Sequence, residues 1–226
     1  MTRLVLDQKL KEIGQEVRVL EEMVKKAMLA AVEALERRDS ETSKRIYEAD
    51  IRINEKRYAI EQECITTIAT QQPLAVDLRI LASVLEVSTE LERMGDYAKG
   101  IAKINLLLKE EPLMEQVKLL PMMAEKAVSM LDQAIEAFIE QDLVAAESIP
   151  KQDDEVDRIY NELYRGLMEC VMKCSEGFDQ ANLLMWAAHN IERTADRVTN
   201  ICERTLFIGT GEIRELDLSL DELLSR

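Results

Sequence analysis

The amino-acid sequence repeats itself after about one hundred residues, and this repeat constrains the fold more than any other feature. Segment 28–39, MLAAVEALERRD, aligns with segment 131–142, LDQAIEAFIEQD, at an offset of 103 residues. The acidic pattern D-x-x-[IV]-[ND] recurs at the same offset, first as Asp50, Ile53 and Asn54 and then as Asp153, Val156 and Asp157. We therefore expect the chain to fold as two similar structural units.

A pair of carboxylates four residues apart also occurs twice. The pair is Glu92 and Asp96 in ELERMGDYAKG, and Glu192 and Asp196 in NIERTADRVTN, at an offset of 100 residues. The shorter offset indicates that the second copy lacks three residues between its second and third helices. Carboxylates at this spacing on a helix repel each other by about 0.3 kcal/mol, so their recurrence calls for a compensating partner.

The spacing of apolar residues is helical along nearly the whole chain. Only 7 glycines and 4 prolines interrupt it, which suits long helices. The pattern predicts helices at residues 5–38, 40–70, 74–108, 115–141, 143–175 and 179–208. The predicted fold class is all-α, with six long helices arranged as two pseudo-symmetric three-helix bundles. The repeats occupy residues 1–110 and 111–208, and an acidic tail follows at 209–226.

Local signals mark several helix boundaries. Arg38-Asp39-Ser40 and Gln141-Asp142 offer capping side chains before the second and fifth predicted helices. Pro121 and Pro150 fall inside the fourth and fifth predicted helices. Because proline lacks a backbone N–H and its ring clashes with the preceding turn, each is expected to kink its helix or delay its start.

The formal net charge of −15 excludes some classes of partner. Nucleic acid and anionic membrane surfaces would repel such a chain, whereas basic surfaces and cations would attract it. No run of 18 uncharged apolar residues occurs, and residues 1–20 lack the layout of a signal peptide. We therefore expect a cytoplasmic protein that binds no nucleic acid and does not insert into the membrane.

Four cysteines do not make a disulfide framework in a chain of 226 residues. Cys170 and Cys174 lie four residues apart on a predicted helix, a spacing that suits a metal or a redox pair. Such residues are more often buried small hydrophobes, and we expect the same of Cys64 and Cys202.

An acidic strip lies beside the core-facing stripe of the last predicted helix. The stripe consists of Ile191, Ala195, Val198 and Cys202. Glu192, Asp196 and Thr199 or Asn200 follow one residue later, about 100° around the helix. The acidic residues of the second and fifth helices flank apolar positions in the same way. Since consecutive helices run antiparallel, each repeat can gather up to four oxygen ligands, which suit a hard cation or a multi-metal cage.

A solvated acidic face is the alternative interpretation. Arg93 precedes Asp96 by three residues, and Arg193 precedes Asp196 in the same way. Each aspartate therefore has a candidate local ion-pair partner worth about 0.3 kcal/mol.

Enzymatic interpretations fit the sequence poorly. Ferritin-like di-iron oxidases need two Glu-x-x-His motifs, whereas His189 is the only histidine and precedes Glu192. The ligand sets of zinc hydrolases, phosphate-binding loops and nucleophile elbows are absent. We therefore expect no enzyme, with His189 as a packing residue or one that contacts a ligand side chain. Trp186 is expected in the core or in a dimer contact.

The assembled motifs resemble those of the PhoU family, the accessory and regulatory proteins of bacterial phosphate uptake, over residues 4–207. The family pattern E-R-x-x-D-x-x-x-N is matched by Glu192, Arg193, Asp196 and Asn200. Its first copy is matched by ELERMGDYAKGIA, except that Gly100 stands where asparagine is expected. The segment QQPLAVDLRIL, residues 71–81, is similar to the family's hinge before the third helix.

The resemblance implies a cytoplasmic six-helix protein that commonly dimerises. It implies a negative regulator of phosphate uptake and of the phosphate-starvation response, acting as an adaptor between the ATPase subunit of the phosphate transporter and a sensor histidine kinase. Some members of the family carry metal clusters on the repeated carboxylates. On this chain the first metal site would be Asp50, Asn54, Glu92 and Asp96, and the second Asp153, Asp157, Glu192, Asp196 and Asn200.

The Gly100 departure removes one potential ligand and favours the second site. Zinc, iron, manganese and magnesium all remain candidate metals. Asp77 and Arg79 are expected to form a buried hinge pair or a partner contact. The alternatives are a metal-independent helical scaffold that regulates another phosphate carrier, a structural scaffold with no phosphate role, and an ion-storage carboxylate protein.

Overall fold

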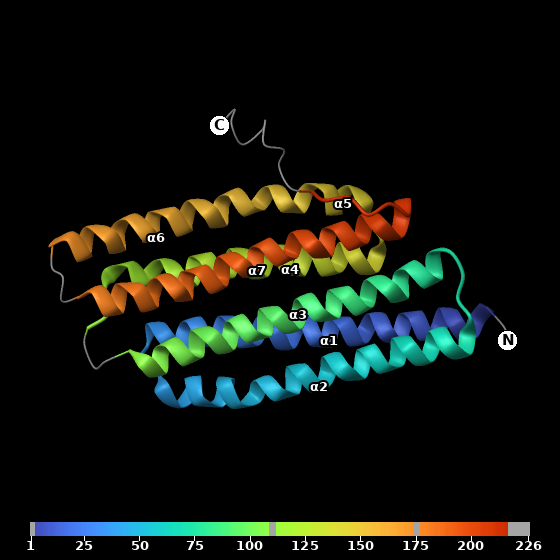
Figure 1. Cartoon of the computed structure of the whole chain (residues 1–226), viewed down its shortest axis with the longest axis horizontal. Helices are drawn as coiled ribbons and strands as arrows, with labels where there is room; N and C mark the ends of the chain where they lie inside the picture. Colours follow the sequence, from blue (N-terminus) through green and yellow to red (C-terminus); the bar gives the residue numbers. More distant parts are fainter. Residues whose placement is uncertain (1–2, 109–111, 174–176, 217–226) are drawn as a thin grey trace.

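The computed structural model describes residues 3–108, 112–173 and 177–216, and these residues form an elongated bundle of six long helices without a strand (Figure 1). The long helices are α1 (Arg3–Glu36), α2 (Ser40–Gln71), α3 (Val76–Leu107), α4 (Leu119–Glu140), α6 (Asp153–Lys173) and α7 (Phe178–Thr210). The short elements are the helix α5 (Leu143–Ser148) and the 3₁₀ helices η1 (Glu115–Lys118) and η2 (Ile149–Gln152). The all-α prediction is confirmed.

The prolines act as expected. Pro121 lies in the first turn of α4, where a missing N–H is tolerated, and the 3₁₀ helix η1 precedes it. Pro150 divides the fifth predicted helix into α5, η2 and α6. Because of this division, Asp153 stands in the first turn of α6.

The connection between the first two helices has the same conformation in both repeats. Asp39 and Asp142 are the N-caps of α2 and α5, and each accepts a hydrogen bond from a backbone N–H of the following turn. The residue before each cap is left-handed, with φ of 58° at Arg38 and 55° at Gln141. The repeat in the sequence is therefore reproduced in the backbone.

The two repeats pack side by side around one continuous core. Helices α1 and α3 of the first repeat contact α4 and α7 of the second, and α2 and α6 lie on the outside (Figure 1). Fully buried side chains from both repeats, among them Leu20, Leu91, Leu120 and Ile191, belong to a single apolar cluster. Burying each such side chain contributes about 2 kcal/mol. Among the described residues, no helix combines the length and apolarity that crossing a lipid bilayer requires.

A buried polar network joins α3 to α7 across the boundary between the repeats. Glu90 is 7% exposed, and its Oε2 accepts hydrogen bonds from Arg197 Nη1 at 2.8 Å and Asn200 Nδ2 at 3.2 Å. Arg197 Nε donates to the Tyr97 hydroxyl at 3.0 Å. A buried carboxylate is tolerated only when it is paired and hydrogen-bonded, and this network supplies both kinds of partner.

A second polar cluster joins α1 to α4. Lys25 Nζ lies 2.8 Å from Asp132 Oδ1 and 2.6 Å from Glu22 Oε1. Burial, together with the neighbouring Asp132, raises the pKa of Glu21 to about 8. Glu21 is therefore largely protonated at neutral pH, which allows two carboxyl groups to share this contact.

Replacing Arg197 by alanine leaves Glu90 buried without its charged partner. We expect the free energy of unfolding to fall by about 3 kcal/mol and the melting temperature by about 9 °C, measured by thermal denaturation. Arg93 contacts the same carboxylate at 3.3 Å from an exposed position, so Arg93→Ala should cost less than about 1 kcal/mol. Equal effects of the two substitutions would contradict this account of the network.

Candidate functional site

Four carboxylates gather between α6 and α7 in the second repeat. Asp153 and Asp157 lie on the first two turns of α6, and Glu192 and Asp196 lie one turn apart on α7. The apolar residues beside them are fully buried: Val156 on α6, and Ile191, Ala195, Val198 and Cys202 on α7. The predicted core stripe is thus confirmed, and it places the carboxylates at the edge of the core.

These carboxylates raise one another's proton affinity. Burial raises the pKa of Asp153 to about 7, and the charges of Asp157, Asp196 and Glu192 add to the effect. Burial is also the main cause of the raised pKa values of Asp157, Glu192 and Asp196. Each ionised carboxylate here is disfavoured by lost hydration and by like charge, so a cation or a proton would stabilise the group.

Two oxygens of this group have no hydrogen-bond partner within the described structure. They are Asp153 Oδ1 and Glu192 Oε2, both shielded from solvent. His189 Nδ1 lies 2.9 Å from Glu192 Oε2, but without the geometry of a hydrogen bond, and the imidazole packs edge-on against Trp186. Buried acceptors without donors are costly in a protein interior, and a metal cation would satisfy them. The residues present therefore fit a cation.

The carboxylate oxygens of Asp153, Asp157, Glu192 and Asp196 do not converge on a single position that one ion could occupy. In the described ranges, the acidic group whose ligand atoms all lie within 4.8 Å of one another is Glu21, Glu22 and Asp132. That group already contacts Lys25, so its negative charge is partly neutralised. The carboxylates of the second repeat stand farther apart, so a single ion would require their side chains to turn inward.

Asn200 has a partner that the sequence analysis did not anticipate. Its amide nitrogen donates to Glu90 on α3, which leaves the amide oxygen for another contact. The pseudo-symmetric position is Gly100, where an added Cβ would lie 3.0 Å from the Asn190 amide nitrogen. Where α3 and α7 cross, Asn200 therefore supplies a hydrogen bond to Glu90, and Gly100 leaves room for the side chain of Asn190.

The corresponding group in the first repeat contains a lysine. Asp50 is 4% exposed, and Lys99 Nζ lies 2.7 Å from its Oδ2 and 4.0 Å from Asp96 Oδ1. Burial raises the pKa values of Glu92 and Asp96, and Asp50 Oδ1 and Asn54 Oδ1 have no hydrogen-bond partner among the described residues. Acidic residues of α2 and α3 therefore meet as predicted, but an ammonium group already stands among them.

Lys99 is the functional residue that the sequence analysis missed. It lies three residues after Asp96, so it reaches the same helix face as the carboxylates. Thr199 occupies the corresponding position in the second repeat. The prediction that favours the second site therefore has a second argument besides Gly100, namely that threonine replaces the lysine there.

The expected local ion pairs do not form among the described residues. Arg93 contacts Glu90 rather than Asp96, and the Arg193 guanidinium lies 4.8 Å from the centre of the Tyr97 ring. Neither arginine forms an ion pair with the carboxylate strip in the described structure, but the charge of Arg193 counters the raised pKa of Asp196. Asp157 and Asp196 are also exposed, as the interpretation of the strip as a solvated acidic face requires.

The remaining predicted residues lie as follows. Asp77 and Arg79 do not pair: Arg3 binds the Asp77 carboxylate, and Arg79 Nε donates to the backbone oxygen of Ile208 at 2.9 Å. Trp186 is 55% exposed, so of the two predicted placements the core is excluded and a dimer contact stays a prediction. Cys64 and Cys202 are buried, and burial raises the pKa of each thiol to about 12.

The last two predictions concern cysteine and the tail. Cys170 is partly exposed and contacts Gln116, whereas Cys174 lies outside the described residues, as does most of the acidic tail, 217–226.

Comparison with known proteins gives a consistent result over almost the whole chain. The family model described as PhoU domain matches twice, at residues 17–104 and 120–205. The phosphate-specific transport system accessory protein PhoU homolog of Clostridium acetobutylicum is 32% identical over 97% of this chain and 100% of its own length. The phosphate-specific transport system accessory protein PhoU of Escherichia coli is 31% identical over 90% of this chain and 84% of its own.

Solved structures agree with the sequence comparison. The crystal structure of the phosphate transport system regulatory protein PhoU from Streptococcus pneumoniae superposes with a TM-score of 0.86 at 34% identity, covering 94% of this chain and 100% of that one. The crystal structure of PhoU from Pseudomonas aeruginosa gives 0.84 at 28% identity, covering 91% and 99%.

The raised pKa of Asp153 makes a prediction about pH. Between about pH 4 and 7 the folded protein holds a proton that the unfolded chain releases, so this group makes stability fall as pH rises. In metal-free protein, Asp153→Asn should remove that part of the slope and, after allowance for solvent screening, stabilise the fold at pH 7 by about 1 kcal/mol. Urea denaturation across this pH range measures both quantities. The exposed neighbour provides the control, and an equal gain in Asp154→Asn would contradict the assignment.

Proposed function

The chain belongs to the PhoU family, and from this membership we propose that it is a cytoplasmic negative regulator of phosphate uptake and of the phosphate-starvation response. It acts as an adaptor, without catalysis, between the ATPase subunit of a phosphate ABC transporter and a sensor histidine kinase. The observation that carries the proposal is the match of both repeats to relatives named for phosphate-specific transport, at nearly full length.

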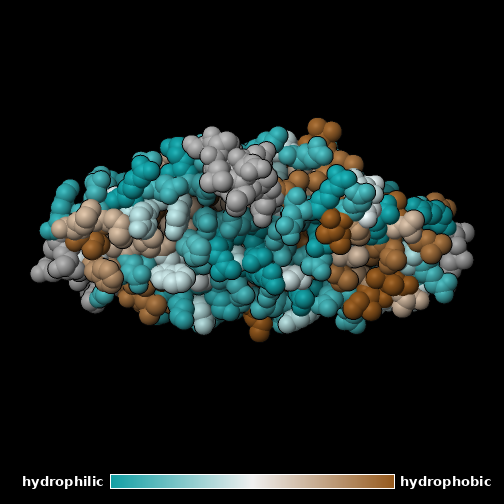
Figure 2. Space-filling view, turned by 45° about the horizontal axis from the view of Figure 1, so that its top comes forward, coloured by the Kyte–Doolittle hydropathy of each residue, from teal (hydrophilic) through white to brown (hydrophobic). Residues whose placement is uncertain are grey.

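An exposed apolar patch supports the role of an adaptor. Leu74 and Leu78, in the segment that resembles the family's hinge, are 79% and 42% exposed, and Leu4 is 76% exposed. The contact of Arg3 with Asp77 brings the start of α1 beside this segment. Figure 2 shows hydrophilic residues over the middle of one face and apolar residues toward its two ends. A partner protein would bury such a patch.

A second copy of the chain is the other proposed partner. The outer helix α2 exposes Ile51, Tyr58 and Ile65, which follow one another at intervals of seven residues. Residues at this interval form one stripe along a helix, and a matching stripe on a second copy would cover it.

We also propose that the repeated carboxylates bind metal, with zinc, iron, manganese and magnesium as candidates. The second site consists of Asp153, Asp157, Glu192, Asp196 and Asn200, and its unpartnered oxygens support the proposal. When bound, a metal would supply the positive charge that offsets repulsion among these side chains. The first site consists of Asp50, Asn54, Glu92 and Asp96, where Lys99 competes for the same oxygens.

The contact of Lys99 with Asp50 also favours the second candidate function. A protein that neutralises a carboxylate with its own ammonium group needs no metal at that position. The contact between Lys99 and Asp50 is therefore also consistent with a metal-independent helical scaffold that regulates another phosphate carrier.

Gene deletion and complementation test the regulatory role. Loss of the gene should activate a phosphate-starvation reporter in phosphate-rich medium, and a wild-type copy should silence it. Leu74→Asp with Leu78→Asp should fail to silence it and should weaken binding to the ATPase subunit or the kinase at least about tenfold, because charge replaces the apolar patch. Met172 is 79% exposed on α6, so Met172→Asp serves as the control. An unchanged reporter and unchanged phosphate uptake in the deletion strain would refute the proposed function.

Elemental mass spectrometry tests the metal sites separately. Protein purified without chelators should contain metal, and Glu192→Ala with Asp196→Ala should remove most of it. Glu162 is an exposed acidic residue of α6, so Glu162→Ala should retain the wild-type content. Glu92→Ala with Asp96→Ala should change the content less, because Lys99 already neutralises that group. Wild-type protein without metal would refute metal binding and leave the regulatory proposal intact.

A further inference from the structure

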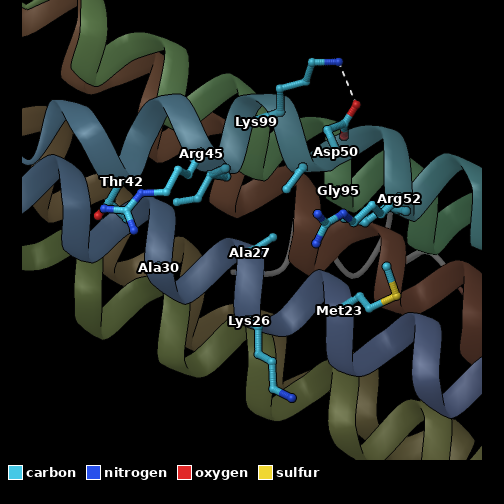
Figure 3. A pocket seen from close by; sticks show the side chains of 13 residues that line it. Met23, Lys26, Ala27, Ala30, Thr42, Arg45, Asp50, Arg52, Gly95 and Lys99 are labelled. Carbon is cyan, nitrogen blue, oxygen red and sulfur yellow. Dashed lines mark hydrogen bonds and ion pairs between the residues drawn. The ribbon is translucent and has the colours of Figure 1, made fainter.

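A groove of about 360 Å³ opens between α1 and α2 in the first repeat, with α3 behind it (Figure 3). Small side chains leave this space free: Ala27 and Ala30 on α1, Ala49 on α2 and Gly95 on α3. Met23, Ile46 and Ile53 complete the apolar surface. The volume is within the usual range for small-molecule sites, and the carboxylate group described above lies at its edge through Asp50.

The second repeat carries longer side chains at the corresponding positions. At the offset of 103 residues, Gln133 corresponds to Ala30 and Gln152 to Ala49. The two glutamines exchange hydrogen bonds, with amide nitrogen to oxygen distances of 3.2 Å and 2.8 Å. Gln133 lies on α4 and Gln152 on the 3₁₀ helix η2, whereas the open groove of the first repeat lies between two continuous helices that carry alanines.

The charges around the two positions also differ. Basic residues line the groove of the first repeat: Lys26, Arg45, Arg52 and Lys99. Their counterparts in the second repeat are Ser129, Ser148, Glu155 and Thr199. In a chain with a net charge of −15, a cluster of four basic residues at one groove favours an anionic ligand.

Two of these cations are available for a ligand. Lys26 points away from the groove and lies 3.6 Å from Glu22, and Lys99 is held by Asp50 (Figure 3). Arg45 and Arg52 are exposed, and neither forms an ion pair within 4 Å in the described structure. Seven residues separate them on α2, or about 10 Å along the helix, so they flank the groove. Guanidinium groups bind phosphate oxygens in bidentate fashion.

Asp50 lines the groove beside α3. It is 4% exposed, and its Oδ2 binds Lys99, while its Oδ1 is shielded from solvent and has no hydrogen-bond partner in the described structure. The carboxylate therefore holds Lys99, and the two arginines are the groups that can bind an anion.

We propose that the groove between α1 and α2 binds a small organophosphate with a flat apolar body, of which a nucleoside monophosphate is the simplest example. The apolar body packs on Ala27, Ala30 and Ala49, and the phosphate binds Arg45 and Arg52. The groove borders the first proposed metal site through Asp50, but ligand binding there requires no metal and does not depend on the proposed regulatory role.

Isothermal titration with adenosine 5′-monophosphate as the probe tests the proposal. The wild-type protein should bind one equivalent, and adenosine and inorganic phosphate, each lacking one half of the probe, should bind at least about tenfold more weakly. Binding should persist in the presence of a chelator. No saturable binding at low-millimolar probe, equal binding of inorganic phosphate, or loss of binding with chelator would each overturn the proposal.

Variants taken from the second repeat locate the site. Ala30→Gln with Ala49→Gln introduces the two glutamines of the second repeat into the groove, and should abolish binding. Gln133→Ala with Gln152→Ala makes the opposite change in the second repeat without adding cations, and should leave binding unchanged. Arg45→Gln with Arg52→Gln alters only exposed side chains, so it tests the site even if the filled variant misfolds, and should weaken binding at least about tenfold. Binding that survives both the filled and the arginine variants would overturn the proposal.

Discussion

The packing of α3 against α7 is the contact on which the rest of the structure depends. It joins the two repeats into one core and buries Glu90, which would be too costly without Arg197 and Asn200 from the other repeat. The same two helices carry the repeated carboxylate pairs. The crossing therefore fixes where both acidic groups stand relative to the core, and it explains why Asn200 and Gly100 differ between the repeats.

The two repeats share the order of their long helices but compensate the repulsion among their carboxylates differently. Both place carboxylates at the edge of the core, where burial disfavours the charged form. In the first repeat Lys99 supplies a permanent positive charge. In the second repeat Thr199 stands in its place, and burial raises the pKa values of Asp153 and Glu192. Asp157 and Asp196 are exposed, so water screens part of the repulsion among these carboxylates.

Helices, caps and core could be predicted from the sequence because they depend on local chemistry and periodicity. Asp39 and Asp142 cap as their residue type requires, Pro150 breaks its helix, and Ile191, Ala195 and Val198 are buried as the apolar period predicts. The partners of long side chains could not be predicted in this way. Arg93 turns to Glu90 instead of Asp96, and Lys99 reaches Asp50 on another helix, because the rotation of each helix against its neighbours decides these contacts.

A repeat protein supplies its own comparison, since each side chain can be judged against its counterpart in the other repeat. A groove with small residues would mean little alone, because alanine is common on helices. The counterpart positions hold two glutamines that hydrogen-bond to each other, so the second repeat accepts longer side chains there. The first repeat leaves the groove open beside Arg45 and Arg52, which form no ion pair within 4 Å in the described structure. A ligand that packs on the alanines and pairs with the arginines would cover this surface.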